Sequence, residues 1–263
     1  MTRKAPISTG AVRTAAICTA ASAALLLSPL LSPALAVADD GGPSAKELSE
    51  QAKDNLLKTD SVHLKLTDRG ADAKSSKTQP TSMDLSLDRD GNCVGTMRMG
   101  SGGGTLELVK RGEQVWMKPD TAFWKAQVPG SQGEAVAELF KNRYIHGSTK
   151  DSLLKGLSDT CDLTAFQKEV DTGSSTDTPL TKGAETKIDG TKVIPLKGTR
   201  DGERAVLYVT SAAPHRLVEA TEKGGGTDMT LTFTDYGEPV PSATPAPDET
   251  VDIGKLQQEL GNA

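Results

Sequence analysis

The chain has 263 residues, with 30 basic and 35 acidic side chains and a formal net charge of −5. Aromatic residues make up only 3% of the chain, too few for the stacking surfaces that bind bases or sugars. The acidic balance and the scarcity of aromatics argue against nucleic acid or an anionic membrane surface as the main partner.

Residues 1–38 have the pattern of an export signal. Three basic residues come first, an Ala/Leu-rich run extends from Ala15 to Leu35, and two overlapping small-x-small cleavage sites end at Ala36 and Ala38. We therefore expect an exported protein, extracellular or associated with the cell envelope. A signal retained as a membrane anchor is the alternative. Cys18 precedes the leucine cluster rather than following it, so we do not expect lipidation.

The remainder of the chain is large enough for one domain with a real core. After cleavage about 225 residues would remain, with 27 basic and 35 acidic side chains and a net charge of −8. We assign this domain to residues 39–251 and expect it to be a monomer. Residues 252–263 are expected to form a short helical tail.

Two cysteines, Cys93 and Cys161, remain after cleavage. An exported protein folds in an oxidising compartment, so we predict a disulfide between them, with two buried thiols as the alternative. The three histidines, His63, His146 and His215, are scattered and lack paired ligand spacing. We expect neither a metal site nor a cofactor.

The first predicted element is a helix that opens at Ser44. Glu47 lies three residues later, which is the spacing of a capping box. Leu48, Ala52 and Leu56 follow at four-residue intervals and give the helix one apolar stripe that can pack on a sheet.

About five strands follow the helix. In Ser61 to Asp68 apolar and polar residues alternate, which places His63 on the polar face, and a polar loop is expected over 69–81. Further alternating runs cover 83–87, 93–99, 105–110 and 114–118. The glycine-rich segment 100–104 lacks the lysine of a phosphate-binding loop and joins two strands, so we interpret it as a hairpin connection.

A helical insert is predicted at about 120–170. Ser131 and Glu134 repeat the capping-box spacing, a brief extended segment is expected at 142–146, and short helices are expected at 151–156 and 162–170. A polar linker covers 172–179. Trp116 and Trp124 either flank a pocket mouth or anchor the core.

About five more strands are predicted in the second half, between Thr181 and Tyr236. The clearest runs cover 191–197, 204–210, 215–223 and 228–235, separated by turn signals at hairpin spacing. Residues 239–247 are expected to form a proline-spaced surface tail. The sequence thus predicts an α+β fold, a curved antiparallel sheet of about ten strands covered on its concave side by short helices.

No catalytic signature is present. The chain lacks Gly-x-Ser-x-Gly, and no histidine lies in a motif that would activate a serine or cysteine. Its carboxylates are spread over amphipathic surfaces, as solvation alone predicts. We therefore do not expect an enzyme.

Three phrases carry a resemblance to a known family: "GTLELVKRGEQVWMKPDTAFWK", "APHRLVEATEK" and "TDMTLTFTDYGEPV". With the order of the elements, they make the chain resemble the LolA-like carriers, in particular LppX/LprG-type actinobacterial envelope lipoproteins. The resemblance implies a half-barrel with helices over its open side and an apolar cavity that holds the acyl chains of lipids or lipoproteins. The chain lacks the lipobox cysteine of the LppX-type members.

The apolar residues of the alternating strands are the candidate cavity wall. They are Val62, Leu64, Leu66, Met83, Leu85, Leu87, Met97, Met99, Val115, Met117, Leu207, Val209, Leu231 and Phe233. On this interpretation the protein carries a lipid or acylated molecule. The alternative is an envelope protein-protein interaction module with a filled core, because an alternating stripe does not report an empty volume.

Overall fold

A computed structural model describes residues 42–254, apart from 129, 174–178 and 201. The predicted export signal lies outside the described residues, as does most of the predicted C-terminal tail. The α-helices are α1 (Ala45–Lys58), α2 (Ala71–Ser75), α3 (Thr121–Gln127), α4 (Ser131–Leu139), α5 (Ser152–Ser158) and α6 (Leu163–Gly173). Short 3-10 helices are η1 (Asp159–Cys161) and η2 (Pro247–Glu249).

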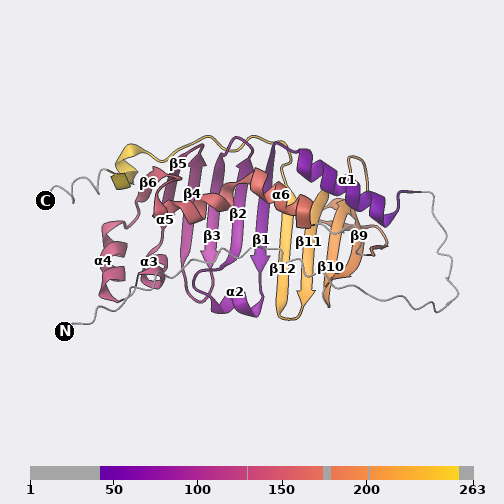
Figure 1. Cartoon of the computed structure of the whole chain (residues 1–263), viewed down its shortest axis with the longest axis horizontal. Helices are drawn as coiled ribbons and strands as arrows, with labels where there is room; N and C mark the ends of the chain where they lie inside the picture. The colour runs from indigo at the N-terminus through magenta and orange to yellow at the C-terminus, as the bar shows by residue number, and fades with distance from the viewer. Residues whose placement is uncertain (1–41, 129, 174–178, 201, 255–263) are drawn as a thin grey trace, which may run out of the picture. The chain divides into compact units, whose positions relative to one another are not determined.

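The strands of the described residues form one large sheet. They are β1 (Ser61–Asp68), β2 (Pro80–Asp88), β3 (Cys93–Met99), β4 (Thr105–Arg111), β5 (Gln114–Pro119), β6 (Tyr144–Ser148), β7 (Thr181–Lys182), β8 (Thr186–Ile188), β9 (Thr191–Arg200), β10 (Glu203–Thr210), β11 (Leu217–Gly224), β12 (Thr227–Thr234) and β13 (Thr250–Asp252). Their order is β13-β6-β5-β4-β3-β2-β1-β12-β11-β10-β9-β7, with β8 also on β9 (Figure 1).

This open sheet confirms the predicted α+β class. The thirteen described strands exceed the expected ten because the short strands β7, β8 and β13 extend the two ends of the sheet. One pair also departs from the prediction of an antiparallel sheet, since β13 runs parallel to β6. Pairing of β1 with β12 joins the first and second halves of the chain in the middle of the sheet.

The capping box predicted for the first helix is confirmed. The Ser44 hydroxyl accepts a hydrogen bond from the Glu47 N–H, and the Glu47 carboxylate accepts one from the Ser44 N–H. These bonds satisfy backbone donors that a helix start otherwise leaves free. The predicted stripe of Leu48, Ala52 and Leu56 is buried.

Two local predictions were wrong. The polar loop expected at 69–81 contains the short helix α2, which is fixed by tertiary contacts such as the bond from the Ser101 N–H to the Lys74 carbonyl, 2.8 Å. The second capping box does not form. Gly130 occupies the N-cap of α4, and Glu134 pairs instead with Lys125, 2.9 Å away.

Two helices, α1 and α6, lie across the sheet and contact each other. In Figure 1, α6 lies over the middle of the sheet, across β1 and β12, and α1 lies over strands of the second half. A buried amide joins the two helices, because Gln167 on α6 donates to the Leu56 and Thr59 carbonyls, each at 2.9 Å. Arg89 donates in turn to the Gln167 amide oxygen at 3.1 Å. Loss of any partner would leave a buried polar group unsatisfied.

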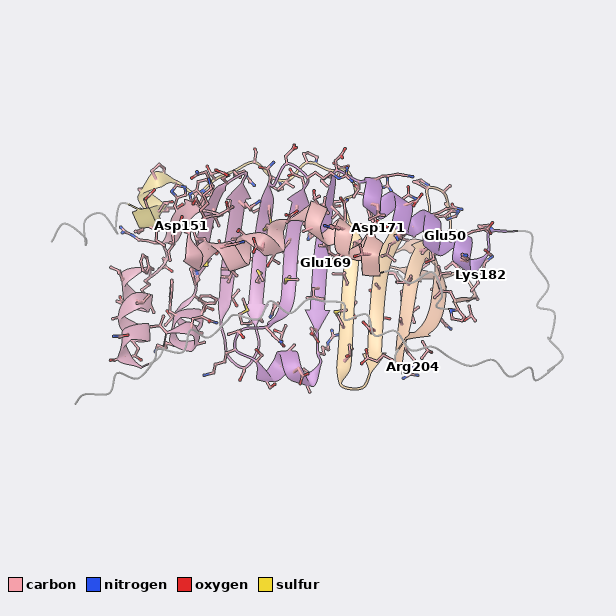
Figure 2. All side chains as sticks on the ribbon, in the orientation of Figure 1. Glu50, Asp151, Glu169, Asp171, Lys182 and Arg204 are labelled. Atoms are coloured by element: carbon pink, nitrogen blue, oxygen red, sulfur yellow. A yellow bond between two sulfur atoms is a disulfide. The ribbon has the colours of Figure 1, made fainter. Side chains whose placement is uncertain are left out.

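A salt bridge completes the joint between the helices. Lys53 on α1 lies 2.9 Å from the carboxylate of Asp171, at the C-terminal end of α6 (Figure 2), and also donates to the Asp171 carbonyl.

Two separate apolar cores result from this arrangement. The larger core consists of Leu56, Val62, Leu85, Leu87, Cys93, Met97, Met99, Leu106, Leu108, Val115, Met117, Phe123, Trp124, Ala137, Phe140, Ile145, Leu154, Cys161, Leu163 and Phe233. The smaller core consists of Leu48, Ala52, Leu196 and Val209. The sheet is continuous beneath both cores, and α1 contributes to each of them, with Leu56 in the larger core and Leu48 and Ala52 in the smaller.

The predicted disulfide is present. Cys93 at the start of β3 is bonded to Cys161 at the end of η1, and both residues are fully buried. The bond fixes the segment between α5 and α6 to the first half of the sheet.

The proline-spaced segment after β12 lies on the surface as predicted, and it is also bound to the rest of the fold. The Arg111 guanidinium donates to the carbonyls of Pro241, Ser242 and Ala243. Figure 1 shows this segment leading along the ends of the strands to β13. Arg111 therefore helps to bring β13 beside β6.

Because of Tyr236, we expect the stability of the fold to fall at alkaline pH. Its hydroxyl donates to the Leu217 carbonyl at 2.7 Å, and burial raises the pKa of the phenol well above its ordinary value of 10.0. In the unfolded chain the phenol ionises near the ordinary value. The stabilisation that Tyr236 contributes is therefore fully present below about pH 10 and is lost as the pH rises above it. We expect Tyr236→Phe to lose about 1 kcal/mol at neutral pH but to show a shallower alkaline decline in denaturant titrations. Equal slopes for the two proteins would contradict this assignment.

Candidate functional site

The predicted cavity residues lie in rows across the sheet. Residues that face each other on neighbouring strands point to the same side. The central row consists of Pro119, Leu106, Met97, Met83, Leu66, Leu231, Ala220, Leu207 and Leu196. The register thus carries one apolar face from β5 to β9, through both halves of the chain.

The fourteen candidate residues differ in burial. Ten are buried in the described structure: Val62, Leu66, Leu85, Leu87, Met97, Met99, Val115, Met117, Val209 and Phe233. The other four, Leu64, Met83, Leu207 and Leu231, are half-buried. All four lie on β1, β2, β10 and β12, near the middle and second half of the sheet.

The half-buried residues form a band between the two cores, which we call the seam: Leu64, Met83, Leu207, Leu217, Ala220 and Leu231. Leu217 packs against both cores. The sequence prediction missed Leu217 and Ala220. Ala220 could have been found from its place opposite Leu231, but a register shift in β11 lies between Leu217 and Glu219 and disturbs the alternation.

A pocket of about 340 Å³ lies at the other side of the larger core, which we call the α4 pocket. Its lining residues come from β4, β5, the start of α3 and the end of α4: Thr105, Leu106, Glu107, Lys118, Pro119, Asp120, Thr121, Ala137, Lys141 and Asn142. Only Leu106 and Ala137 of this set belong to the larger core. No sequence pattern indicates this pocket, because three separate segments of the chain, within 105–107, 118–121 and 137–142, build it.

Charged groups at the α4 pocket are joined by an ion pair and a hydrogen bond. Lys118 lies 2.9 Å from Glu107, whose second carboxylate oxygen accepts a 2.6 Å hydrogen bond from Tyr144. Partial burial opposes ionisation of Glu107, but the hydrogen bonds from Lys118 and Tyr144 together outweigh it and lower its pKa. The hydrogen bond to Glu107 raises the pKa of Lys118. Both groups are therefore charged at neutral pH.

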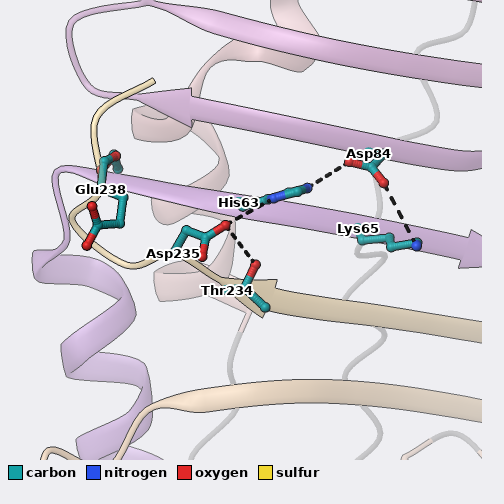
Figure 3. A network of polar contacts seen from close by, with 7 residues as sticks. His63, Lys65, Asp84, Thr234, Asp235 and Glu238 are labelled. Carbon is teal, nitrogen blue, oxygen red and sulfur yellow. Dashed lines mark hydrogen bonds and ion pairs between the residues drawn. The ribbon is translucent and has the colours of Figure 1, made fainter. Parts of the chain in front are cut away.

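The opposite face of the sheet carries polar networks. His63 lies 2.7 Å from Asp84 and 3.3 Å from Asp235, and Lys65 also approaches Asp84 (Figure 3). These contacts link β1 to β2 and to the end of β12. His63 is on the polar face as predicted and is half-buried there.

The two tryptophans take different places. Trp124 is buried in the larger core between Phe123 and Phe140, so it anchors the core. Trp116 lies half-buried on the polar face of the sheet and stacks on His146, with ring centroids 4.7 Å apart. His146 also contacts Asp252 at 3.1 Å, which connects β6 to β13.

Comparison with known proteins found similar structures but no similar sequence. No family model matches the chain, and no curated protein matches its sequence. LprF from Mycobacterium bovis matches with a TM-score of 0.50 and 16% identity, over 78% of this chain and 100% of LprF. The chain has an LprF-like fold. This confirms the resemblance to LppX/LprG-type envelope lipoproteins at the level of the fold.

Two further solved structures are similar in part. The Mycobacterium tuberculosis lipoprotein LppX matches with a TM-score of 0.46 and 16% identity, covering 76% of this chain and 98% of LppX. A LolA superfamily protein from Nitrosomonas europaea matches with a TM-score of 0.24 and 11% identity, over 76% of this chain and 96% of that protein. In the described part of the LprF-like fold, no helix is long and apolar enough to cross a membrane.

Proposed function

We propose that the protein is a non-catalytic carrier that binds the alkyl part of a lipid or acylated molecule between its sheet and its helices. The observation that carries the proposal is the seam, where apolar side chains of β1, β2 and β10–β12 are only half-buried between two separate cores. An alkyl chain laid along the seam would bury these side chains. Each buried methylene contributes about 0.8 kcal/mol.

The LprF-like fold supports this function because the family resemblance implies lipid carriage. Met83 also suits an adaptable site, since its thioether side chain can follow different ligand shapes. We further propose that residues 1–38 direct export and that residues 39–251 form the carrier domain. A cell-envelope protein is an alternative partner, and it becomes the better explanation if no lipid binds.

Lipid uptake tests the proposal. We expect organic extraction and mass spectrometry of the purified protein to find bound lipid, and a fluorescent fatty acid to bind it saturably. Leu207→Asn and Leu231→Asn should each weaken uptake about tenfold, because each places an amide without a partner against the alkyl chain. Val206→Asn is the matched control, because Val206 is half-buried on β10 beside Leu207 but faces the opposite side of the sheet.

Two results would contradict the carrier function. One is the absence of both extracted lipid and fatty acid uptake in the unmodified protein. The other is equal uptake by the seam variants and Val206→Asn, with all of them folded by circular dichroism. The first result would favour the interaction module.

A further inference from the structure

All the methionines of the described strands point to the apolar face of the sheet. They are Met83, Met97, Met99, Met117 and Met229. The central row contains Met83 and Met97, and each of the other three lies two residues along its strand from a member of that row. Residues two apart on a strand share one side of the sheet. The thioether sulfurs are therefore concentrated on the face that we propose for the alkyl chain.

Burial divides these methionines into two groups. Met97, Met99 and Met117 belong to the larger core, and only 3%, 7% and 0% of their surface is exposed. Met83 and Met229 are half-buried. Met83 is part of the seam, and Met229 lies two residues along β12 from another member of the seam, on the same side of the strand. Solvent can therefore reach two of the five side chains, and both are at the seam.

Met229 lies near the turn between β11 and β12. Its neighbours across the sheet are Asp68 on β1 and Glu222 on β11. Met229 belongs to neither of the two cores and does not pack against either of them. In Figure 1, the β11–β12 turn lies at the opposite end of these strands from α1 and α6. Met229 thus marks the end of the seam that lies away from the two helices.

The methionines are the oxidisable sulfurs of the described residues. Cys93 and Cys161 form a disulfide and are fully buried, so neither offers a thiol. Hydrogen peroxide oxidises a thioether by transfer of an oxygen atom: a sulfur lone pair attacks, an S–O bond forms, the O–O bond breaks and water leaves. The sulfur loses two electrons and the peroxide gains them. The product is a sulfoxide, which is polar where the thioether was apolar.

We propose that Met83 and Met229 form a peroxide-sensitive modification site that controls ligand binding in the seam. Oxidation of either residue places a sulfoxide oxygen against the alkyl chain, which offers no hydrogen-bond donor to satisfy it. A bound alkyl chain, in turn, covers both sulfurs and protects them from peroxide. This inference rests on the proposed carrier function and adds a regulation of the same site.

Peptide mass mapping after treatment with hydrogen peroxide tests the selectivity of the site. Met83 and Met229 should gain an oxygen atom at least about tenfold faster than Met97, Met99 and Met117, because the buried sulfurs react only when the core opens. With a saturated fluorescent fatty acid at about ten times its Kd, only about a tenth of the protein is free, so oxidation of Met83 and Met229 should slow about tenfold. Free methionine added to both samples controls for the peroxide concentration.

Fatty acid binding before and after peroxide tests the control of binding. The Kd of the unmodified protein should rise about tenfold, and methionine sulfoxide reductases should restore it, with an unchanged circular dichroism spectrum throughout. The double variant Met83→Leu/Met229→Leu keeps apolar side chains of similar volume but cannot form a sulfoxide, so peroxide should change its Kd less than about twofold.

Met117→Leu is the matched control for the double variant. It removes a buried sulfur from the same face of the sheet and keeps Met83 and Met229, so its Kd should rise on treatment as that of the unmodified protein does. Each protein is compared with itself before and after peroxide. A change in the affinity of an untreated variant therefore does not affect the result.

Several results would overturn the inference. Oxidation of Met97, Met99 and Met117 as fast as that of Met83 and Met229 would remove the selective site. An unchanged Kd after oxidation, or equal losses in the double variant and the unmodified protein, would remove the control of binding. If the fatty acid binds saturably without slowing oxidation, the carrier function stands and the two sulfurs do not contact the ligand. If the untreated protein binds no lipid, the carrier function itself fails, and the proposed regulation fails with it.

Discussion

Replacing both Cys93 and Cys161 with alanine should lower the free energy of unfolding by about 4 kcal/mol. The bond closes a chain segment with a sequence separation of 68 residues, and in the chain-entropy model a loop of that length restricts the unfolded state by about this amount. Alanine is the suitable replacement because both positions are fully buried and apolar. Denaturant titration of the two proteins measures the difference.

The effect should be unequal across the structure. Cys161 lies two residues before the start of α6, so hydrogen exchange in α6 should accelerate more than exchange in β10 or β11. Reduction of the unmodified protein is the control and should reproduce the loss seen in the double variant. A loss below about 1 kcal/mol would show that the disulfide contributes little to the native fold.

Gly95→Ala should destabilise the protein by more than about 3 kcal/mol. Gly95 has φ of +157°, and a Cβ atom there would lie 1.9 Å from the Asp84 carbonyl oxygen on β2. That contact is with backbone in the middle of the sheet, so relief requires β2 and β3 to move apart. The pairing of Gly95 with Leu85 would be lost, and with it packing in the larger core.

Gly112→Ala is the matched control for this substitution. Gly112 also has a positive φ, +54°, but no atom lies within 4 Å of an added Cβ in the β4–β5 turn. Its cost should be limited to backbone strain, about 1 kcal/mol. Similar losses for the two variants would show that conformation, not the approach of β2, determines the role of Gly95.

Much of the fold could be predicted from local patterns. Val62, Leu64 and Leu66 alternate with polar residues, and this period of two allows only a strand with one apolar face. The capping pair of Ser44 and Glu47 acts within one helical turn, so the prediction needed no knowledge of the rest of the chain.

Predictions failed where a segment depends on distant partners. Helix α2 buries only Ala73 and is too short to be stable alone, so its sequence resembles a loop. The Ser131 and Glu134 spacing matched a capping box, but Lys125 on the neighbouring helix α3 competes for the Glu134 carboxylate. The parallel pairing of β13 depends on a segment that Arg111 holds from elsewhere in the sheet.

The candidate site shows the same division. The sequence by itself determined the apolar face, the two halves of the sheet and the cysteine pair, because alternation, turn residues and compartment chemistry are local or compositional properties. Only the tertiary structure decided that ten of the fourteen wall residues are buried while Leu64, Met83, Leu207 and Leu231 are half-buried. It also placed three segments around the α4 pocket. The physical reason is that burial depends on where helices dock, and docking is set by long-range contacts such as those of Gln167 and the disulfide, which leave no periodic pattern in the sequence.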